Sequence, residues 1–422
     1  MILKSNKFKN INEYISNNTD LNICIITHCY PPDFGAAPHQ YAHMAESFRS
    51  IGHNVTVLTS HPYYPTGKLS YRDFFKLRRH VNINNVDVYR HWLIPSQKNS
   101  AFFRLLSMVT MLLSMLTSIS LLRKRKIDVV IVQTPPITLP LLGILLKRLQ
   151  NIKLVLNVSD LWPQAMVDLG SIKTGSFAYK ILHRLEKFYY NKADFIITQS
   201  DETKNYIQNL GYKDVFLYRI GADINVFYPR KNANRNGKLK IVYTGVLGVA
   251  HGIFDLIKTV PFDALDCELH IYGDGIEERK IRNYIISKSL KNVILHPKVF
   301  YKEIPEVVKK YDVALISQKK YVKGTLPAKL YESLSLGMPV LFHGQGEGEL
   351  LVTKHQCGFT SRPDNLEQFI KNIKALQRLS DKEHQQLSVR SRKAAVNNYD
   401  RDLQFSTFYE ALKTVTESLI YV

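Results

Sequence analysis

Two charged side chains, Lys329 and Glu332, lie three residues apart in the segment TLPAKLYESLSLGMPV at 325–340. Pro327, next to Leu326, favours the start of a helix, whose N-terminus presents unpaired N–H groups and a positive dipole end. Such an end binds phosphate, and Lys329 would add a full charge. Glu332 on the same helix face could accept hydrogen bonds from ribose hydroxyls. The segment predicts a nucleotide site, with an ordinary surface Lys–Glu pair as the alternative.

A second candidate group lies in the N-terminal half, where Asp160 and Trp162 follow the apolar run 154–158. Asp160 could orient or deprotonate an acceptor hydroxyl, and Trp162 could stack on a sugar face. His39 is expected to border the same opening. Each proposal has a structural alternative, because Asp160 could cap a helix N-terminus and Trp162 could be a core residue.

Glycines follow several expected strands. Gly35 is expected to begin a helix, where the missing Cβ would let the backbone approach a phosphate or sugar, although it could also simply turn the chain. Neither half contains a well-formed GxGxxG pattern, which disfavours a dehydrogenase. The sequence also lacks a DxD pair and any His/Asp cluster with metal-ligand spacing. We therefore expect no metal and no cofactor, with protein cations stabilising the charge of a bound phosphate group.

Several motifs together resemble the retaining GT-B glycosyltransferase superfamily of the family-four type, and more narrowly the bacterial transferases that build O-antigen, capsule and colanic acid. The matching segments are HCYPPDFG at 28–35, GHNVTVLT at 52–59, SDLWP at 159–163, GADINVFYP at 221–229, YTG at 243–245, YGDG at 272–275 and the helix segment at 325–340. Each motif is weak alone, but their order and spacing over nearly the whole chain are specific.

The resemblance implies that the second domain binds a nucleotide-sugar donor and the first domain an acceptor. It implies Asp160 as the catalytic residue and His39 and Trp162 on the acceptor side. The donor residues that it implies are Gly35, Gly245, His251, Gly273, Asp274, Gly275, Lys298, Leu326, Pro327, Lys329 and Glu332.

Three positions depart from the family pattern. Gly324 stands where the family commonly has the first of two glutamates eight positions apart, which usually touches the donor sugar. Val246 and His251 replace the common Arg and Lys that clamp the diphosphate. The phosphate contact would then depend more on Lys329 and on helix N-termini. His251 would take part in it or would be a capping or packing histidine.

Apolar runs rich in Ile, Val and Leu alternate with helical stretches, which is typical of buried parallel strands. The expected strands are 23–27, 55–59, 129–133, 154–158, 195–198 and 215–218, then 240–243, 268–272, 293–296, 313–317 and 339–342. They predict an α/β protein of the GT-B type, with two Rossmann-like doubly wound domains facing across a cleft. The expected boundaries are an N-terminal domain at 1–220 with a polar leader arm at 1–22, a linker at 221–238, a second domain at 239–400 and a terminal helix at 401–422 that packs back on the first domain.

The chain carries 57 Lys plus Arg against 36 Asp plus Glu, a net charge of +21 that would attract polyanions. No zinc finger, homeodomain-like helix or aromatic RNP pattern accompanies it, so we expect an anionic membrane surface and not nucleic acid as a partner. Four cysteines lack CxxC spacing and are expected to be reduced core residues of a cytosolic protein. They are Cys24, Cys29, Cys267 and Cys357.

The segment 105–122 has no charged residue and is followed by RKRK at 123–126. Its length and basic flank would permit a membrane span, but Ser and Thr dilute its hydrophobicity and it leads into the strand 129–133. We favour a helix packed partly on its own sheet and partly at the membrane interface, with a buried helix or a span as alternatives. The first 22 residues lack the apolar stretch of a signal peptide. A cytoplasmic protein attached peripherally to the inner face of the cytoplasmic membrane is therefore expected.

By resemblance, the function is retaining transfer of a hexose or N-acetylhexosamine from a nucleotide diphosphate, with UDP expected. The implied acceptor is a polyprenyl-diphosphate-linked saccharide in O-antigen or capsule synthesis. Two alternatives remain open. A GT-B-fold sugar-nucleotide epimerase would need no lipid acceptor, and a non-catalytic partner that binds sugar nucleotides or lipid would explain the departures at Gly324 and Val246.

Overall fold

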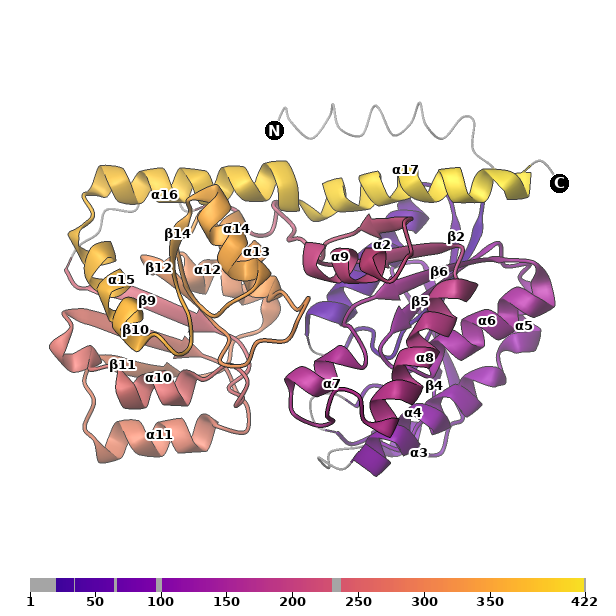
Figure 1. Cartoon of the computed structure of the whole chain (residues 1–422), viewed down its shortest axis with the longest axis horizontal. Coiled ribbons are helices and arrows are strands. Elements are labelled where there is room, and N and C mark those ends of the chain that lie inside the picture. Colours follow the sequence, from indigo (N-terminus) through magenta and orange to yellow (C-terminus); the bar gives the residue numbers. More distant parts are fainter. Residues whose placement is uncertain (1–19, 34, 64–66, 96–100, 230–236, 421–422) are drawn as a thin grey trace.

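The computed structural model describes residues 20–33, 35–63, 67–95, 101–229 and 237–420. The leader arm expected at 1–22 therefore lies almost wholly outside the described residues. Two α/β domains, each built on one mostly parallel sheet, make up the described chain, as expected for the GT-B type. Figure 1 shows them side by side with one long helical segment along both. The predicted fold class is confirmed.

The N-terminal sheet has eight strands in the order β3-β4-β2-β1-β5-β6-β7-β8. They are β1 (Asn22–Ile26), β2 (Asn54–Ser60), β3 (Arg78–Ile83), β4 (Val86–His91), β5 (Val129–Thr134), β6 (Lys153–Val158), β7 (Phe195–Thr198) and β8 (Val215–Leu217). All neighbouring pairs are parallel except β3 and β4. The β3–β4 hairpin was not expected because its residues are largely charged and polar, as suits a sheet edge.

Helices cover both faces of this sheet because strand side chains alternate. The helices are α2 (Ala36–Ser50), α3 (Tyr71–Phe74), α4 (Ala101–Leu116), α5 (Ile119–Lys124), α6 (Leu139–Gln150), α7 (Gln164–Asp168), α8 (Phe177–Lys192) and α9 (Asp201–Asn209). Cys24 and Ile26 pack in the core that contains α4, α6 and α8, whereas Ile23 and Ile25 pack in the core that contains α2. The continuous apolar runs of the sequence follow from this two-sided burial.

The C-terminal sheet has six parallel strands in the order β11-β10-β9-β12-β13-β14. They are β9 (Leu239–Thr244), β10 (Cys267–Tyr272), β11 (Val293–His296), β12 (Val313–Ser317), β13 (Val340–His343) and β14 (Gly358–Ser361). The helices of this half are α10 (Ile253–Thr259), α11 (Glu278–Ser287), α12 (Ile304–Val308), α13 (Ala328–Ser335), α14 (Glu347–His355), α15 (Leu366–Arg378) and α16 (Asp381–Ala394). The edge strand β14 is short and was not expected.

The chain passes between the domains twice, and the two passages pair with each other. Ala222 forms a parallel bridge with Asp400, just after a π-helical turn at Ala395–Tyr399. The helix α17 (Arg401–Ile420) then returns to the first domain. Its Phe405, Phe408 and Leu412 are buried in the core beside α2, and Figure 1 shows α16 and α17 running along both domains.

The segment 105–122 is not one continuous helix, which corrects that expectation. The helix α4 ends at Leu116 and α5 begins at Ile119. In the turn between the two helices, the N–H groups of Thr117 and Ser118 donate to carbonyls of the last turn of α4. Ser and Thr in a helix compete for backbone hydrogen bonds, which explains an early end. Within the described residues, no helix has the length and apolarity that crossing a bilayer requires. The four cysteines are buried free thiols.

Candidate active site

The side chain of Lys329 projects from the first turn of α13, the helix that the sequence predicts as the nucleotide site. Pro327 is the N-cap of α13 and lies just before the helix, one position earlier than its expected place in the first turn. The Lys329 ammonium donates a hydrogen bond to the Tyr243 hydroxyl over 3.1 Å and lies 4.2 Å from the centre of that ring. Burial lowers the pKa of Lys329 to about 8, with Glu332 acting in the opposite direction. In the described chain no carboxylate forms an ion pair with this ammonium.

Gly245, immediately after β9, leaves the space in which the Lys329 ammonium lies. Its φ of 141° is in the region that favours glycine, and a Cβ built there would lie 2.5 Å from the Lys329 Nζ. Tyr243 fixes the same turn by donating a hydrogen bond from its hydroxyl to the Val246 carbonyl over 2.8 Å. A strand end, a glycine turn and a helix N-terminus therefore meet around one cation, which is an arrangement suited to phosphate.

His251 lies near this cation, and the structure favours a neutral ring. Burial, together with the nearby charge of Lys329, lowers the pKa of His251 to about 4. Its backbone carbonyl accepts a hydrogen bond from Ser317 over 2.6 Å, which joins the turn after β9 to the end of β12. A neutral imidazole could donate one hydrogen bond to a phosphate but would not supply the charge of the lysine that the family commonly has there.

Glu332 lies one turn beyond Lys329 and is hydrogen-bonded to the hydroxyl of Tyr301. The same hydroxyl contacts Arg401, whose charge opposes the rise in the pKa of Glu332 that burial causes. The Tyr301 ring also stacks on His39 of the first domain, with ring centres 4.3 Å apart. The expected ribose-binding carboxylate and the expected acceptor-side histidine are thus brought to one tyrosine.

The loop between β12 and α13 is held by three carboxylates of the first domain. Asp160 accepts a hydrogen bond from the Thr325 hydroxyl over 3.0 Å, and Asp168 accepts one from the Lys323 N–H over 2.9 Å. Glu202 accepts the Gly324 N–H over 2.8 Å and also the Tyr321 hydroxyl. Burial raises the pKa of Asp160. Asp160 does not cap α7, whose N-cap is Pro163, so that alternative is wrong.

The structure explains why position 324 is a glycine. Gly324 has a φ of 82°, and a Cβ there would overlap the hydroxyl of Thr203 in α9. A glutamate at this position would be displaced by the first domain. The carboxylate that lies at this backbone position comes instead from Glu202, on the opposite side of the domain interface.

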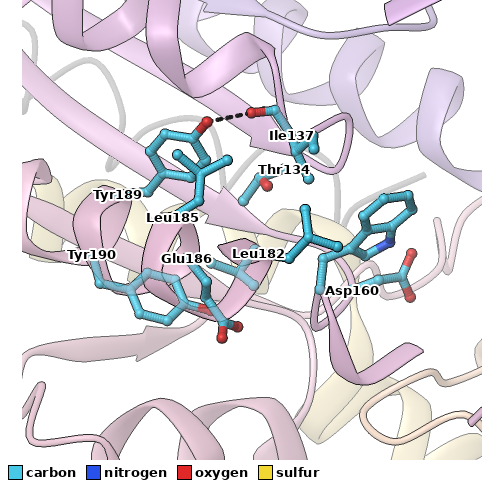
Figure 2. Close-up of a pocket in the computed structure, with 10 residues that line it drawn as sticks. Thr134, Ile137, Asp160, Leu182, Leu185, Glu186, Tyr189 and Tyr190 are labelled. Atoms are coloured by element: carbon cyan, nitrogen blue, oxygen red, sulfur yellow. Dashed lines mark hydrogen bonds between the residues drawn. The ribbon is translucent and has the colours of Figure 1, made fainter. Parts of the chain in front are cut away.

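Trp162 lines a pocket in the first domain together with Asp160, Thr134 and side chains of α8. Figure 2 shows that Leu182, Leu185, Glu186, Tyr189 and Tyr190 form the α8 side of this pocket. Burial raises the pKa of Glu186 to about 7, although the hydroxyls of Tyr190 and Tyr206 donate hydrogen bonds to it. The lining is largely apolar, and its Glu186 carboxyl group is held by Tyr190, Tyr206 and the His183 ring.

Three other glycines were predicted for the donor site, and they lie where the backbone turns or packs closely. Gly35 is the N-cap of α2 with a φ of 127°, and a Cβ there would only touch Pro38. A Cβ on Gly273 would overlap the carbonyl of Gly245, and one on Gly275 would overlap the carbonyl of Leu247. These two glycines let the loops after β9 and β10 pack backbone to backbone. Asp274, between them, pairs with Lys298 over 2.9 Å, and both side chains are exposed. Leu326 packs on the core beside α13.

Residues 35–216 match the family of glycosyl transferase 4-like domains, and residues 226–394 match the glycosyl transferases group 1 family. The sucrose-phosphate synthase of Thermosynechococcus elongatus shares the fold with a TM-score of 0.73 over 94% of this chain and 100% of that one, at 14% identity. The chain is a GT-B glycosyltransferase.

Among curated proteins, this glycosyltransferase is similar to the colanic acid biosynthesis glycosyl transferase WcaI of Escherichia coli strain K12. The two are 23% identical over 82% of this chain and 89% of WcaI. It is also similar to the glycosyltransferase WbjE of Pseudomonas aeruginosa, with 25% identity over 52% of this chain and 58% of WbjE. The structure of HepE from Anabaena in complex with UDP and glucose has a TM-score of 0.65 and 12% identity over 93% of this chain and 99% of that one. These likenesses support the predicted bacterial polysaccharide subgroup.

Several residues of this glycosyltransferase site were not predicted from the sequence. Glu202 lies in an acidic first turn directly after β7, a position that the rule for ligand sites at strand ends would have indicated. Tyr243 precedes the expected Gly245 by two residues and gave no separate signal. Arg401 and Tyr301 reach Glu332 only because α17 and the loop after β11 meet there.

Proposed function

We propose that this glycosyltransferase moves a hexose or N-acetylhexosamine from UDP to a polyprenyl-diphosphate-linked saccharide, with retention at the transferred carbon. The product would extend a cell-surface polysaccharide such as O-antigen or capsule. The observation that carries the donor half of the proposal is the ammonium of Lys329. It is partly buried at a helix N-terminus, its hydrogen bond goes to a tyrosine hydroxyl, and burial lowers its pKa to about 8.

A diphosphate would give the Lys329 ammonium an anionic partner. A partly buried cation without an anionic partner destabilises the folded chain, and two phosphate groups beside Gly245 would supply the missing charge. Structures of the same fold support UDP as the nucleotide, because HepE was solved with UDP and glucose and the trehalose-6-phosphate enzyme of Escherichia coli with UDP-2-fluoro glucose. Lys329 would then stabilise the charge that develops on the departing diphosphate, with no metal required.

The acceptor half of the proposal uses the first domain. The bond from the sugar carbon to the diphosphate oxygen breaks while the acceptor oxygen bonds to the same carbon, and the acceptor proton passes to the departing phosphate. Asp160 would orient the acceptor hydroxyl, and Trp162 beside it would contact the acceptor sugar. The raised pKa of Asp160 suits hydrogen bonding to a hydroxyl at a site shielded from water.

The lipid-linked acceptor would place the enzyme on the inner face of the cytoplasmic membrane. Peripheral attachment is supported by the net charge of +21, which attracts anionic lipid. Attachment without a spanning segment agrees with the helices of the described residues, none of which is suited to cross a bilayer.

A donor panel tests the proposal. UDP-, GDP- and ADP-linked sugars are each incubated with the protein, and released nucleotide and sugar products are measured by chromatography and NMR. We expect slow hydrolysis of a UDP-sugar. Retention predicts that an α-linked donor releases its sugar first as the α anomer. Binding of a donor without any turnover would contradict the proposed enzymatic function and favour a non-catalytic protein that binds sugar nucleotides. Conversion of the donor into an epimeric UDP-sugar would favour an epimerase.

Glu332→Gln tests the ribose contact separately. The substitution keeps the shape of the side chain but removes the charge that would accept hydrogen bonds from two ribose hydroxyls. We expect UDP affinity, measured by isothermal titration calorimetry, to fall about tenfold. 2′-Deoxy-UDP is the matched control. The wild-type protein should bind it more weakly than UDP, whereas Glu332→Gln should bind the two ligands with about equal affinity. Equal discrimination by both proteins would remove Glu332 from the ribose site.

A further inference from the structure

A group of exposed apolar side chains surrounds the short helix α3 in the first domain. Tyr71, Phe74, Phe75 and Leu77 are between 52% and 84% exposed, within seven consecutive residues. Soluble proteins seldom expose several large apolar side chains together unless the surface binds something. None of these four residues belongs to the donor or acceptor site described above.

The helix α4 adds a second apolar stripe. Phe102, Leu105, Val109 and Leu113 recur at helical spacing and are all exposed, whereas Met111 and Met115 on the other face are buried in the core. One face of α4 therefore packs on the sheet and the other is left exposed. The exposed face is as apolar as the buried one, which core packing alone does not require.

The two apolar groups lie side by side. The carbonyl of Leu77 accepts the Trp92 N–H, and the carbonyl of Trp92 accepts the hydroxyl of Ser114 in α4. Arg78 completes the contact by donating to the carbonyl of Thr117 and to the hydroxyl of Ser118. Figure 1 shows α3 and α4 along the same edge of the first domain, away from the interface with the second. We call the surface formed by 67–79 and the outer side of α4 the docking face.

The charge of the docking face is almost entirely positive. The residues 67–79 and 101–117 contain a single acidic side chain, Asp73. Asp73 is buried and is paired with Arg79 over 2.7 Å. The exposed cations of these segments are Lys68, Arg72, Lys76, Arg78 and Arg104. A surface that interleaves large apolar side chains with cations matches an anionic lipid surface, whose phosphates lie just outside its acyl region.

We infer that the docking face binds an anionic lipid bilayer, with the aromatic side chains of α3 entering the interface and the surrounding cations bound to lipid phosphates. A second copy of the chain is a poorer occupant. A symmetric contact would bring the same cations of both copies together. The inference rests on the proposed function only for its purpose, which is to bring the enzyme to a lipid-linked acceptor.

Vesicle flotation tests the inference on the full chain. The wild-type protein should float with vesicles that contain phosphatidylglycerol and far less with vesicles of phosphatidylcholine alone. Phe74→Ser/Phe75→Ser and Arg72→Glu/Lys76→Glu should each reduce the vesicle partition coefficient at least about tenfold. Matched controls in the second domain, Ile286→Ser and Lys374→Glu/Lys382→Glu, remove equally exposed apolar or charged groups and should float like the wild type.

Two flotation results would overturn the inference. One is equal flotation of the docking-face variants and the wild type, and the other is flotation that ignores the lipid charge. Light scattering gives an independent check, since a wild-type dimer that becomes monomeric in Phe74→Ser/Phe75→Ser would assign the face to a second copy. UDP binding is measured on every variant and should not change. If the wild type did not bind UDP, the proposed function would be contradicted, but the vesicle result would still hold.

Discussion

Replacement of Lys329 by methionine is expected to lower the catalytic efficiency toward the sugar-nucleotide donor by about 10²- to 10³-fold. This is the size of effect found when one group that stabilises transition-state charge is removed. Methionine keeps the length of the side chain and its contact with the Tyr243 ring but loses the charge. The measurement is kcat/KM for donor hydrolysis and, in parallel, the affinity for UDP.

The folded protein should tolerate this change. Because burial lowers the pKa of Lys329 to about 8 from an ordinary 10.5, the unfolded chain binds more protons than the folded chain between these values. Lys329 therefore makes stability rise with pH across that window, and its charge destabilises the fold below it. We expect Lys329→Met to melt at the same temperature as the wild type or higher near pH 7.

The same pKa predicts a pH dependence of donor binding. UDP affinity of the wild type should weaken as pH rises through about 8, since the free ammonium loses its proton there, whereas that of Lys329→Met should stay flat. Lys374→Met, which removes an exposed cation from the same domain, serves as the control and should behave like the wild type. Wild-type turnover in Lys329→Met would rule out Lys329 as the phosphate ligand.

Arg219→Met is expected to destabilise the protein by about 3–5 kcal/mol, the usual effect of removing one partner of a buried ion pair. Arg219 and Glu347 form an ion pair in which both side chains are buried. Arg219 also pairs with Asp201 over 2.7 Å and donates to the Tyr331 hydroxyl over 3.3 Å. One guanidinium thus joins the first domain to α13 and α14, and its loss leaves a buried carboxylate without its cation. Urea unfolding measures the effect.

A second substitution separates the charge from the packing. Glu347→Gln in the Arg219→Met background removes the orphaned charge but keeps an acceptor for the Glu202 N–H. The double variant should regain about half of the lost stability or more. If the double variant were as unstable as Arg219→Met alone, the loss would lie in packing and hydrogen bonds to neutral groups, and the ion-pair explanation would fail.

Most parallel strands of both sheets could be predicted because burial on both faces imposes continuous apolar runs. The runs 195–198, 293–296 and 313–317 match β7, β11 and β12 residue for residue. Two elements that include an edge strand were missed, although the edge strands β8 and β11 were predicted. The hairpin β3–β4 and the strand β14 lie at sheet edges, where polar residues are tolerated and the apolar signal is lost. The break between α4 and α5 was missed for a related reason, since local hydrogen bonds of Ser and Thr decide it.

The sequence by itself determined the two-sheet α/β fold, the glycosyltransferase family and the Lys329–Glu332 helix. These depend on local periodicity and on motifs within short segments. Only the tertiary structure decided which groups meet across the domains. Glu202, Asp168 and Asp160 converge on one loop, and Arg401 and Tyr301 reach Glu332, because the packing of separate elements sets those contacts. The glycine at 324 shows the difference, since its reason is a neighbour 121 positions away, Thr203, that no local pattern reveals.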